Sequence, residues 1–201
     1  MKKKNLSLMR ISGIILLLIF TIALLNSCTS SYLTTWKNPQ YSGSAFNKIV
    51  VVGLMKELRM RKSLEYDFVK MLKDRGVNAI ASLDFLSPDT KQTRDEIEGE
   101  LAKYGVDGIL MFELLGVDKE KRYVPTTYYY DYYYGWWGVQ SGGYYTSTTD
   151  VKYQISLYAN SDDKLVWTGQ SDTYNPANMA DLVNSLGPKI IASLKKEGLI
   201  K

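Results

Sequence analysis

Apolar residues along this chain occur either in short continuous runs or in stripes with helical spacing. The β-branched run KIVVVGL at residues 48–54 ends in leucine after a glycine, and comparable runs cover residues 77–82 and 106–117. Such runs predict central strands that are covered on both faces. Residues 150–159 and 164–173 follow, separated by a short polar segment, and this pattern predicts a hairpin.

Three segments between and after these runs have helical periodicity: residues 60–75, a segment ending at Gly105, and residues 177–197. Gly76 is expected to end the first helix in a left-handed conformation. Pro188 cannot donate a backbone hydrogen bond, so the last helix is expected to kink or restart there. The predicted apolar stripes are Leu64, Phe68, Met71 and Leu72; Ile97, Leu101 and Tyr104; and Leu182, Val183, Leu186, Ile190, Ile191 and Leu194.

The order of these elements is β-α-β-α-β-β-β-α. A strand, helix and strand in succession predict parallel strands joined by right-handed crossovers. The sequence therefore predicts one α/β domain over residues 47–201, with a mixed sheet of about five strands and three helices. Residues alternate between the two faces of the hairpin, and this alternation predicts that one row of side chains points into the core: Tyr153, Ile155, Leu157 and Trp167.

The amino-terminal segment has the layout of a signal peptide. Four basic residues lie among the first ten, and the apolar run at residues 11–25 is shorter than a membrane-spanning helix needs. Leu25 and Ser27 stand before Cys28 in a pattern that resembles the bacterial lipobox. We therefore expect residues 1–27 to be removed and Cys28 to carry a diacylglycerol and acyl chains such as palmitate. The alternative is an uncleaved anchor in which the cysteine is incidental.

The composition restricts the chemistry. The chain has no histidine, and Cys28 is its only cysteine, so a lipid there leaves no free thiol. Serine–histidine catalysis, cysteine–histidine catalysis and the usual zinc sites are excluded. We expect no metal, no cofactor and no enzymatic activity.

The net charge of +4 comes from the signal peptide. Four of the 25 basic residues precede Cys28 and no acidic residue does, so the remaining chain carries 21 of each sign. A neutral exported domain has no electrostatic attraction to nucleic acid. We therefore expect no nucleic-acid partner.

Residues 28–46 are polar and without period, which predicts a tether between the lipid and the domain. Trp36 and Tyr41 are the exceptions in this segment. Apolar residues of a tether usually find the nearest core, so both are expected to pack back on the domain edge.

The most unusual segment is an insert at residues 124–149, which separates the third and fourth predicted strands. Its centre, YYYDYYYGWWGVQSGGYY, contains eight tyrosines and two tryptophans. Long structureless connections are usually functional or disordered, and disordered chains are poor in aromatic residues. The candidate binding residues are Tyr128, Tyr129, Tyr130, Asp131, Tyr132, Tyr133, Tyr134, Trp136, Trp137, Tyr144 and Tyr145.

Several interpretations of this insert stay open. Tyrosine and tryptophan give large contact area and keep a polar tip, which suits a protein partner, a sugar or the membrane headgroup layer. Tyrosine-rich segments can also stack between chains. The structural alternative is that the flanking strands extend into a long twisted hairpin with tyrosines paired across it.

Two further groups of residues are candidate sites. Arg59 and Arg61 lie near a helix start at the carboxyl end of a parallel strand, where anions bind. However, Arg61 and Glu65 have i, i+4 spacing, which favours a solvated local ion pair. The four acids in or beside the insert leave a glycosidase-type carboxylate pair as an alternative; they are Asp118, Glu120, Asp131 and Asp150.

Several short elements together resemble a family of small, mostly uncharacterised Gram-negative envelope lipoproteins. They are the lipobox before Cys28 and, over residues 36–200, WKNP, KIVVVGL, the R-x-x-x-E of Arg61 and Glu65, YGVDGIL, LVWTG and KKEGLI. The domain of these lipoproteins is similar to the α/β module of the TolB amino-terminal region, the curli secretion lipoprotein and the penicillin-binding-protein activator lipoproteins. The resemblance implies a scaffold for protein contacts in the periplasm and brings no catalytic motif.

These observations predict a non-enzymatic binding or assembly module, held in the cell envelope by its amino-terminal lipid. Thr29 after Cys28 resembles an outer-membrane sorting signal, so we expect attachment to the outer membrane on its periplasmic side. An envelope protein is the first expected partner and a glycan the second. The alternative function is a carbohydrate-binding protein or carbohydrate-active enzyme of the envelope, and the sequence leaves the oligomeric state open.

Overall fold

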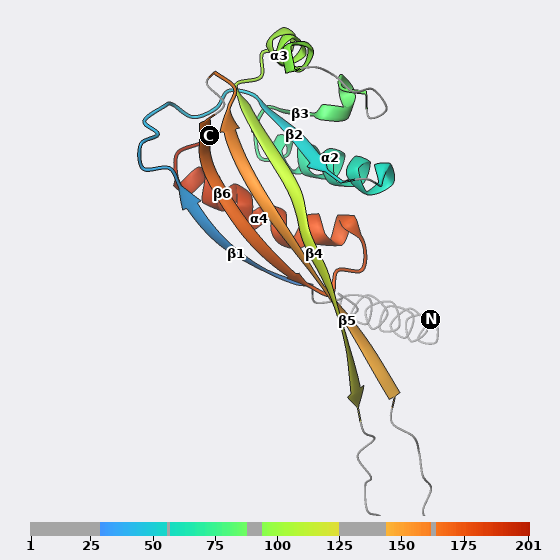
Figure 1. Ribbon diagram of the computed structural model, residues 1–201. Helices are drawn as coiled ribbons and strands as arrows, with labels where there is room; N and C mark the ends of the chain where they lie inside the picture. The colour runs from blue at the N-terminus through green and yellow to red at the C-terminus, as the bar shows by residue number, and fades with distance from the viewer. Residues whose placement is uncertain (1–28, 56, 88–93, 125–143, 162–163) are drawn as a thin grey trace, which may run out of the picture.

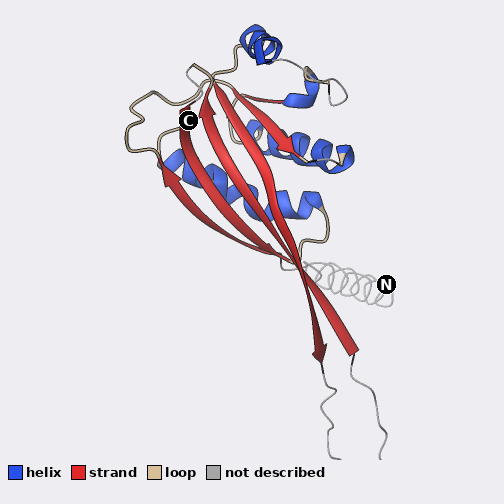
Figure 2. Ribbon diagram, viewed as in Figure 1, coloured by secondary structure: helices blue, strands red, loops and turns tan. Residues whose placement is uncertain are grey.

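The computed structural model describes residues 29–55, 57–87, 94–124, 144–161 and 164–201 of the 201-residue chain. In these residues one mixed six-stranded sheet has the order β1-β6-β5-β4-β2-β3, with helices on both faces (Figures 1 and 2). The predicted α/β class is confirmed, with one strand more than expected. The strands are β1 (Ser30–Lys37), β2 (Ile49–Leu54), β3 (Ala79–Ala81), β4 (Gly108–Val124), β5 (Tyr144–Ala159) and β6 (Lys164–Tyr174), and the helices are α2 (Leu58–Lys73), α3 (Arg94–Lys103) and α4 (Met179–Lys196), with a short 3-10 turn η1 (Ser82–Asp84).

The parallel part of the sheet is formed by β2 between β3 and β4. Ile49 is aligned with Ala79 on one side and with Gly108 on the other. Ile49, Val50 and Val51 are completely buried, as expected for a β-branched strand in the middle of a sheet. The other neighbours are antiparallel: β4 pairs with β5, β5 with β6, and β6 with β1.

Helices α2 and α4 pack on one face of the sheet and form the main core with it. The predicted inward row is buried there, and the Trp167 indole Nε1 donates to the Ser193 hydroxyl of α4 at 3.1 Å. Phe68 of α2 meets Phe112 of β4 edge to face, with ring centroids 5.0 Å apart. The apolar stripes predicted for the first and last helices therefore face the sheet.

The last helix runs through Pro188 as one element, so the predicted restart is wrong. Proline removes one backbone hydrogen bond. Leu186 before it and Ile190 after it are both buried in the main core. Burial on both sides of the proline holds the two halves of the helix on the same sheet face.

Helix α3 covers the opposite face of the sheet only beside β2 and β3. Leu101 of α3 packs there with Val50 and Val106 in a small second core. Tyr104 stacks on Phe85 with ring centroids 4.6 Å apart. As predicted, Gly76 has positive φ, at 80°, after the first helix, and Gly105, where the second helix was predicted to end, has positive φ as well, at 64°.

The prediction of a tether over residues 28–46 is wrong for most of its length, because these residues are part of the domain. Ser30–Lys37 forms the edge strand β1, paired antiparallel with β6 from Ser30↔Tyr174 to Lys37↔Trp167. Its pattern was missed because an edge strand with one open face buries few side chains. Trp36 is 49% exposed on that open face, whereas Tyr41 stacks on Phe46 and packs against the main core.

Among the helices described, none is long and apolar enough to cross a membrane.

Candidate functional site

The β4–β5 hairpin extends well beyond the other strands. Strand β6 ends at Tyr174, which is aligned with Asp150 of β5. Beyond that row β4 and β5 pair alone for six more positions, from Lys119↔Thr149 to Val124↔Tyr144. At about 3.3 Å per residue this two-stranded ribbon, residues 119–124 and 144–149, is about 20 Å long. Figure 1 shows it projecting from one end of the domain.

The structural alternative for the insert is confirmed as far as the ribbon reaches. Tyr123 is aligned with Tyr145, so tyrosines do pair across a long hairpin. The strands were predicted to end at Tyr123 and Asp150, and β5 instead begins six residues earlier, at Tyr144. The remaining predicted binding residues lie outside the described residues; they are Tyr128, Tyr129, Tyr130, Asp131, Tyr132, Tyr133, Tyr134, Trp136 and Trp137.

Two of the four candidate carboxylates are brought together where the ribbon leaves the sheet. Asp118 and Asp150 are aligned across β4 and β5. The Lys152 ammonium donates to Asp118 Oδ2 at 2.6 Å, and this bond raises the pKa of Lys152 above its usual value. Glu120 is exposed two residues further along β4, and Asp131 lies outside the described residues. Asp118 is thus already engaged in an ion pair.

A β-bulge interrupts β4 just before this point. The register shifts between Leu114 and Gly116. Leu115 is 51% exposed and Val117 is 45% exposed. Bulges re-aim side chains and increase local twist, so this one accompanies the change from a covered sheet to a free ribbon.

The predicted anion site has a different environment from the one expected. The Arg61 Nε donates to Glu65 Oε1 at 2.8 Å, so the i, i+4 pair forms, but the Glu65 side chain is completely buried. Arg61 also donates to the Ser82 hydroxyl at 2.8 Å. An anion at Arg61 would have to compete with this buried carboxylate, while Arg59 is exposed.

Glu65 also receives hydrogen bonds from elsewhere in the fold. The backbone N–H groups of Gly53 and Leu83 donate to it at 2.9 Å and 3.0 Å, and the Ser82 hydroxyl lies within 2.9 Å of both its oxygens. These contacts join α2 to β2 and to the turn after β3. The arrangement is a buried polar link between elements of the fold.

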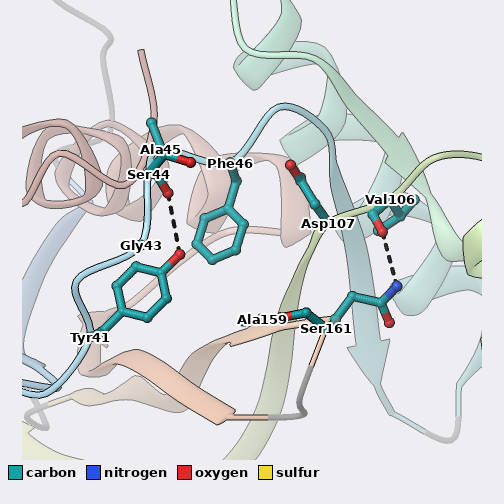
Figure 3. Close-up of a pocket in the computed structure, with 10 residues that line it drawn as sticks. Tyr41, Gly43, Ser44, Ala45, Phe46, Val106, Asp107, Ala159 and Ser161 are labelled. Carbon is teal, nitrogen blue, oxygen red and sulfur yellow. Dashed lines mark hydrogen bonds between the residues drawn. The ribbon is translucent and has the colours of Figure 1, made fainter.

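A pocket of about 420 Å³ lies at the opposite end of the sheet from the ribbon, at the amino ends of β2 and β4 (Figure 3). Tyr41 and Phe46 line one side, and Asp107 and Asn160 line the other. The Tyr41 hydroxyl donates to the Ser44 carbonyl at 3.2 Å, and the Asn160 amide donates to the Val106 carbonyl at 3.0 Å.

The charged side chain in this pocket is already hydrogen-bonded to other groups of the protein. Asp107 accepts hydrogen bonds from the backbone N–H groups of Asn47 and Lys48, both at 2.8 Å, and from the Asn47 side chain at 2.9 Å. These bonds fix the chain where it enters β2. Asp107 was not predicted as a structural residue, because the segment it contacts is 60 residues away.

No group of three or more potential metal-ligating side chains occurs within the part of the chain that the structure describes.

No protein-family model matches this chain, and no curated protein matches it. Several solved structures are similar to this chain over most of their own length. A PelC dodecamer from Paraburkholderia phytofirmans is 15% identical, with a TM-score of 0.48, and the match covers 82% of this chain and 97% of that one. Lipoprotein GNA1162 from Neisseria meningitidis is 12% identical, with a TM-score of 0.42, over 74% of this chain and 98% of that one. At these values we draw no functional conclusion from either structure, and the resemblance to the envelope-lipoprotein family stays a prediction.

Proposed function

We propose that this protein is a lipid-anchored envelope protein that acts as a non-enzymatic binding module, with the Tyr/Trp-rich segment at the tip of the β4–β5 ribbon as its contact surface. The observation that carries the proposal is the ribbon. It extends about 20 Å past the last row in which β6 pairs with β5 and leads into the aromatic segment. A hairpin of this kind presents its tip to a partner without disturbing the core.

The anchor is supported by the sequence at the amino terminus. The basic start, the short apolar run and the residues before Cys28 resemble a lipoprotein signal. Thr29 at the next position resembles an outer-membrane sorting signal. We therefore propose attachment to the outer membrane on its periplasmic side.

The contact chemistry is supported by the composition of the tip. Tyrosine and tryptophan dominate binding surfaces because they supply large area with few rotatable bonds and retain a hydrogen-bonding tip. The chain from Cys28 onward carries no net charge and no histidine, and its one cysteine is the proposed lipidation site, so these side chains favour contact over histidine- or thiol-based catalysis at such a tip. A protein of the envelope is the partner that these features favour.

Deletion of residues 126–146, with a Gly-Gly connection, tests this function. The variant should keep the circular dichroism spectrum of the parent and lose a cross-linked or co-purified envelope partner. A control variant, Tyr66→Ala, removes an exposed tyrosine from α2 and should retain the partner. Equal recovery of the partner by the parent and the deletion variant would show that the tip is not the contact surface.

A further inference from the structure

The first strand of the domain begins directly beside the proposed lipidation position. Strand β1 begins at Ser30, so only Thr29 separates Cys28 from the sheet. The two-residue step from Cys28 to Ser30 spans at most about 7 Å in a fully extended chain. The Thr29 hydroxyl also donates to the Asp181 carboxylate of α4 at 2.5 Å, which ties the chain to the domain immediately after Cys28. A lipid on Cys28 therefore holds the domain against the bilayer instead of at the end of a long tether.

The β4–β5 ribbon leaves the sheet at the same end as the start of β1. Ser30 is aligned with Tyr174 of β6, and Tyr174 is aligned with Asp150 of β5. Ser30 is thus two strand spacings, about 10 Å, from the ribbon base. Figure 1 shows the beginning of β1 and the departure of the ribbon at one end of the domain, and α3 at the other.

The exposed side chains at this end suit a lipid headgroup layer. Tyr32 is 75% exposed and Tyr174 is 44% exposed, both close to the first residue of β1. Tyrosine is enriched at membrane interfaces because its ring is amphipathic. Lys119 and Glu120, at the start of the ribbon, are also exposed.

The ribbon is unsuited to the hydrocarbon layer. It has two strands and therefore two open edges of backbone N–H and C=O groups, which cannot be satisfied in lipid. Exposed Lys119 and Glu120 add a charge cost. The ribbon base lies about 10 Å from Ser30, and Ser30 lies within about 7 Å of the anchored Cys28. The ribbon must therefore lie along the headgroup layer or point away from it. Because it leaves the domain at the anchored end, we favour the headgroup layer.

We propose that the domain docks directly on the membrane that holds its lipid, with the β1 start, Tyr174 and the β4–β5 ribbon in the headgroup layer and α3 at the end facing away. This inference rests on the lipidation of Cys28 in the proposed function. It adds that the ribbon tip meets its partner at the surface of the same membrane.

Site-directed fluorescence on the full lipidated chain tests this orientation. Because Cys28 is the only native cysteine, a second cysteine can be labelled alone once Cys28 carries lipid. Ser147→Cys places an environment-sensitive dye on the exposed side of the ribbon, and Ala102→Cys places it on the exposed side of α3. The labelled proteins are reconstituted into phosphatidylethanolamine–phosphatidylglycerol vesicles that contain a lipid with a nitroxide on its headgroup.

Quenching at Ser147→Cys is expected to be at least fivefold stronger than at Ala102→Cys. A control chain that begins at Thr29, and so has neither the lipid nor the apolar run at residues 11–25, should not float with the vesicles. If the labelled chain floats but both positions are quenched equally, or Ala102→Cys more strongly, the orientation is overturned while the lipid anchor stands. If the wild-type chain itself fails to float, the anchor is wrong, and this inference falls with it.

Discussion

Replacing Glu65 with alanine should strongly destabilise the domain. The side chain is completely buried and accepts hydrogen bonds from Arg61, from Ser82 and from two backbone N–H groups. The alanine variant leaves these donors without their acceptor, and the Arg61 guanidinium, whose side chain is only 18% exposed, without its counter-ion. Removing one partner of a buried ion pair costs about 3–5 kcal/mol.

A matched control lies at the carboxyl end of the same helix, where Asp74 is the C-cap residue. Lys70 and Asp74 also have i, i+4 spacing and lie 2.6 Å apart, but both side chains are more than half exposed. Loss of such a pair costs about 0.5 kcal/mol or less. Glu65→Ala and Asp74→Ala therefore remove one carboxylate each and differ chiefly in burial.

Urea unfolding followed by circular dichroism measures both changes on the chain beginning at Thr29. Glu65→Ala should lower the unfolding free energy by about 3–5 kcal/mol and the melting temperature by roughly 10 °C. A loss within about 1 kcal/mol of that for Asp74→Ala would refute the reasoning, because it would mean that the buried donors are satisfied without the carboxylate.

Three other predictions concern pH and packing. Burial raises the pKa of Tyr153 to about 12, so the unfolded tyrosine loses its proton first and stability should fall between about pH 10 and 12. Tyr153→Phe should reduce that fall in urea midpoints, and the part that is left includes Tyr66, whose pKa is raised by its hydrogen bond to Asp84. The hydrogen bond from Thr29 lowers the pKa of Asp181, so the ionised carboxylate adds to the stability of the fold above the ordinary carboxyl pKa, and this stabilisation is lost as the pH falls below it. The urea midpoint of Asp181→Asn should therefore decrease less between pH 7 and pH 3 than that of the wild type. A Cβ at Gly108 would lie 2.9 Å from the Phe46 ring, so Gly108→Ala should cost about 1–3 kcal/mol in urea unfolding, whereas Gly99→Ala, in open space on α3, should cost nothing.

The periodicity of the sequence predicted the elements that bury the most apolar surface. Residues 48–54 have one continuous β-branched run, and the stripe from Leu64 to Leu72 has helical spacing, so β2 and α2 were found close to their observed bounds. Strand β1 was missed because Tyr32, Thr34 and Trp36 alternate onto a face that no described helix covers. A half-exposed edge strand has a weak apolar signal.

Contacts over long sequence separation could not be predicted. The spacing of Arg61 and Glu65 indicated their pair, but its burial depends on Ser82, which comes from the turn after another strand. Likewise, Thr29 meets Asp181 across 152 residues, and this contact replaces the expected tether. The position of the insert was predicted from its composition, while the length of the ribbon depends on strand pairing that composition does not determine.

Photo-crosslinking in intact cells tests the central claim, contact through the ribbon tip, most directly. A photoreactive amino acid replaces Trp136 or Tyr130 in the aromatic segment, and Tyr66 on α2 serves as the control position. The proposed function predicts a discrete cross-linked envelope protein from both tip positions and none from Tyr66. Absence of any adduct from the tip, or an equally strong adduct from Tyr66, would contradict it.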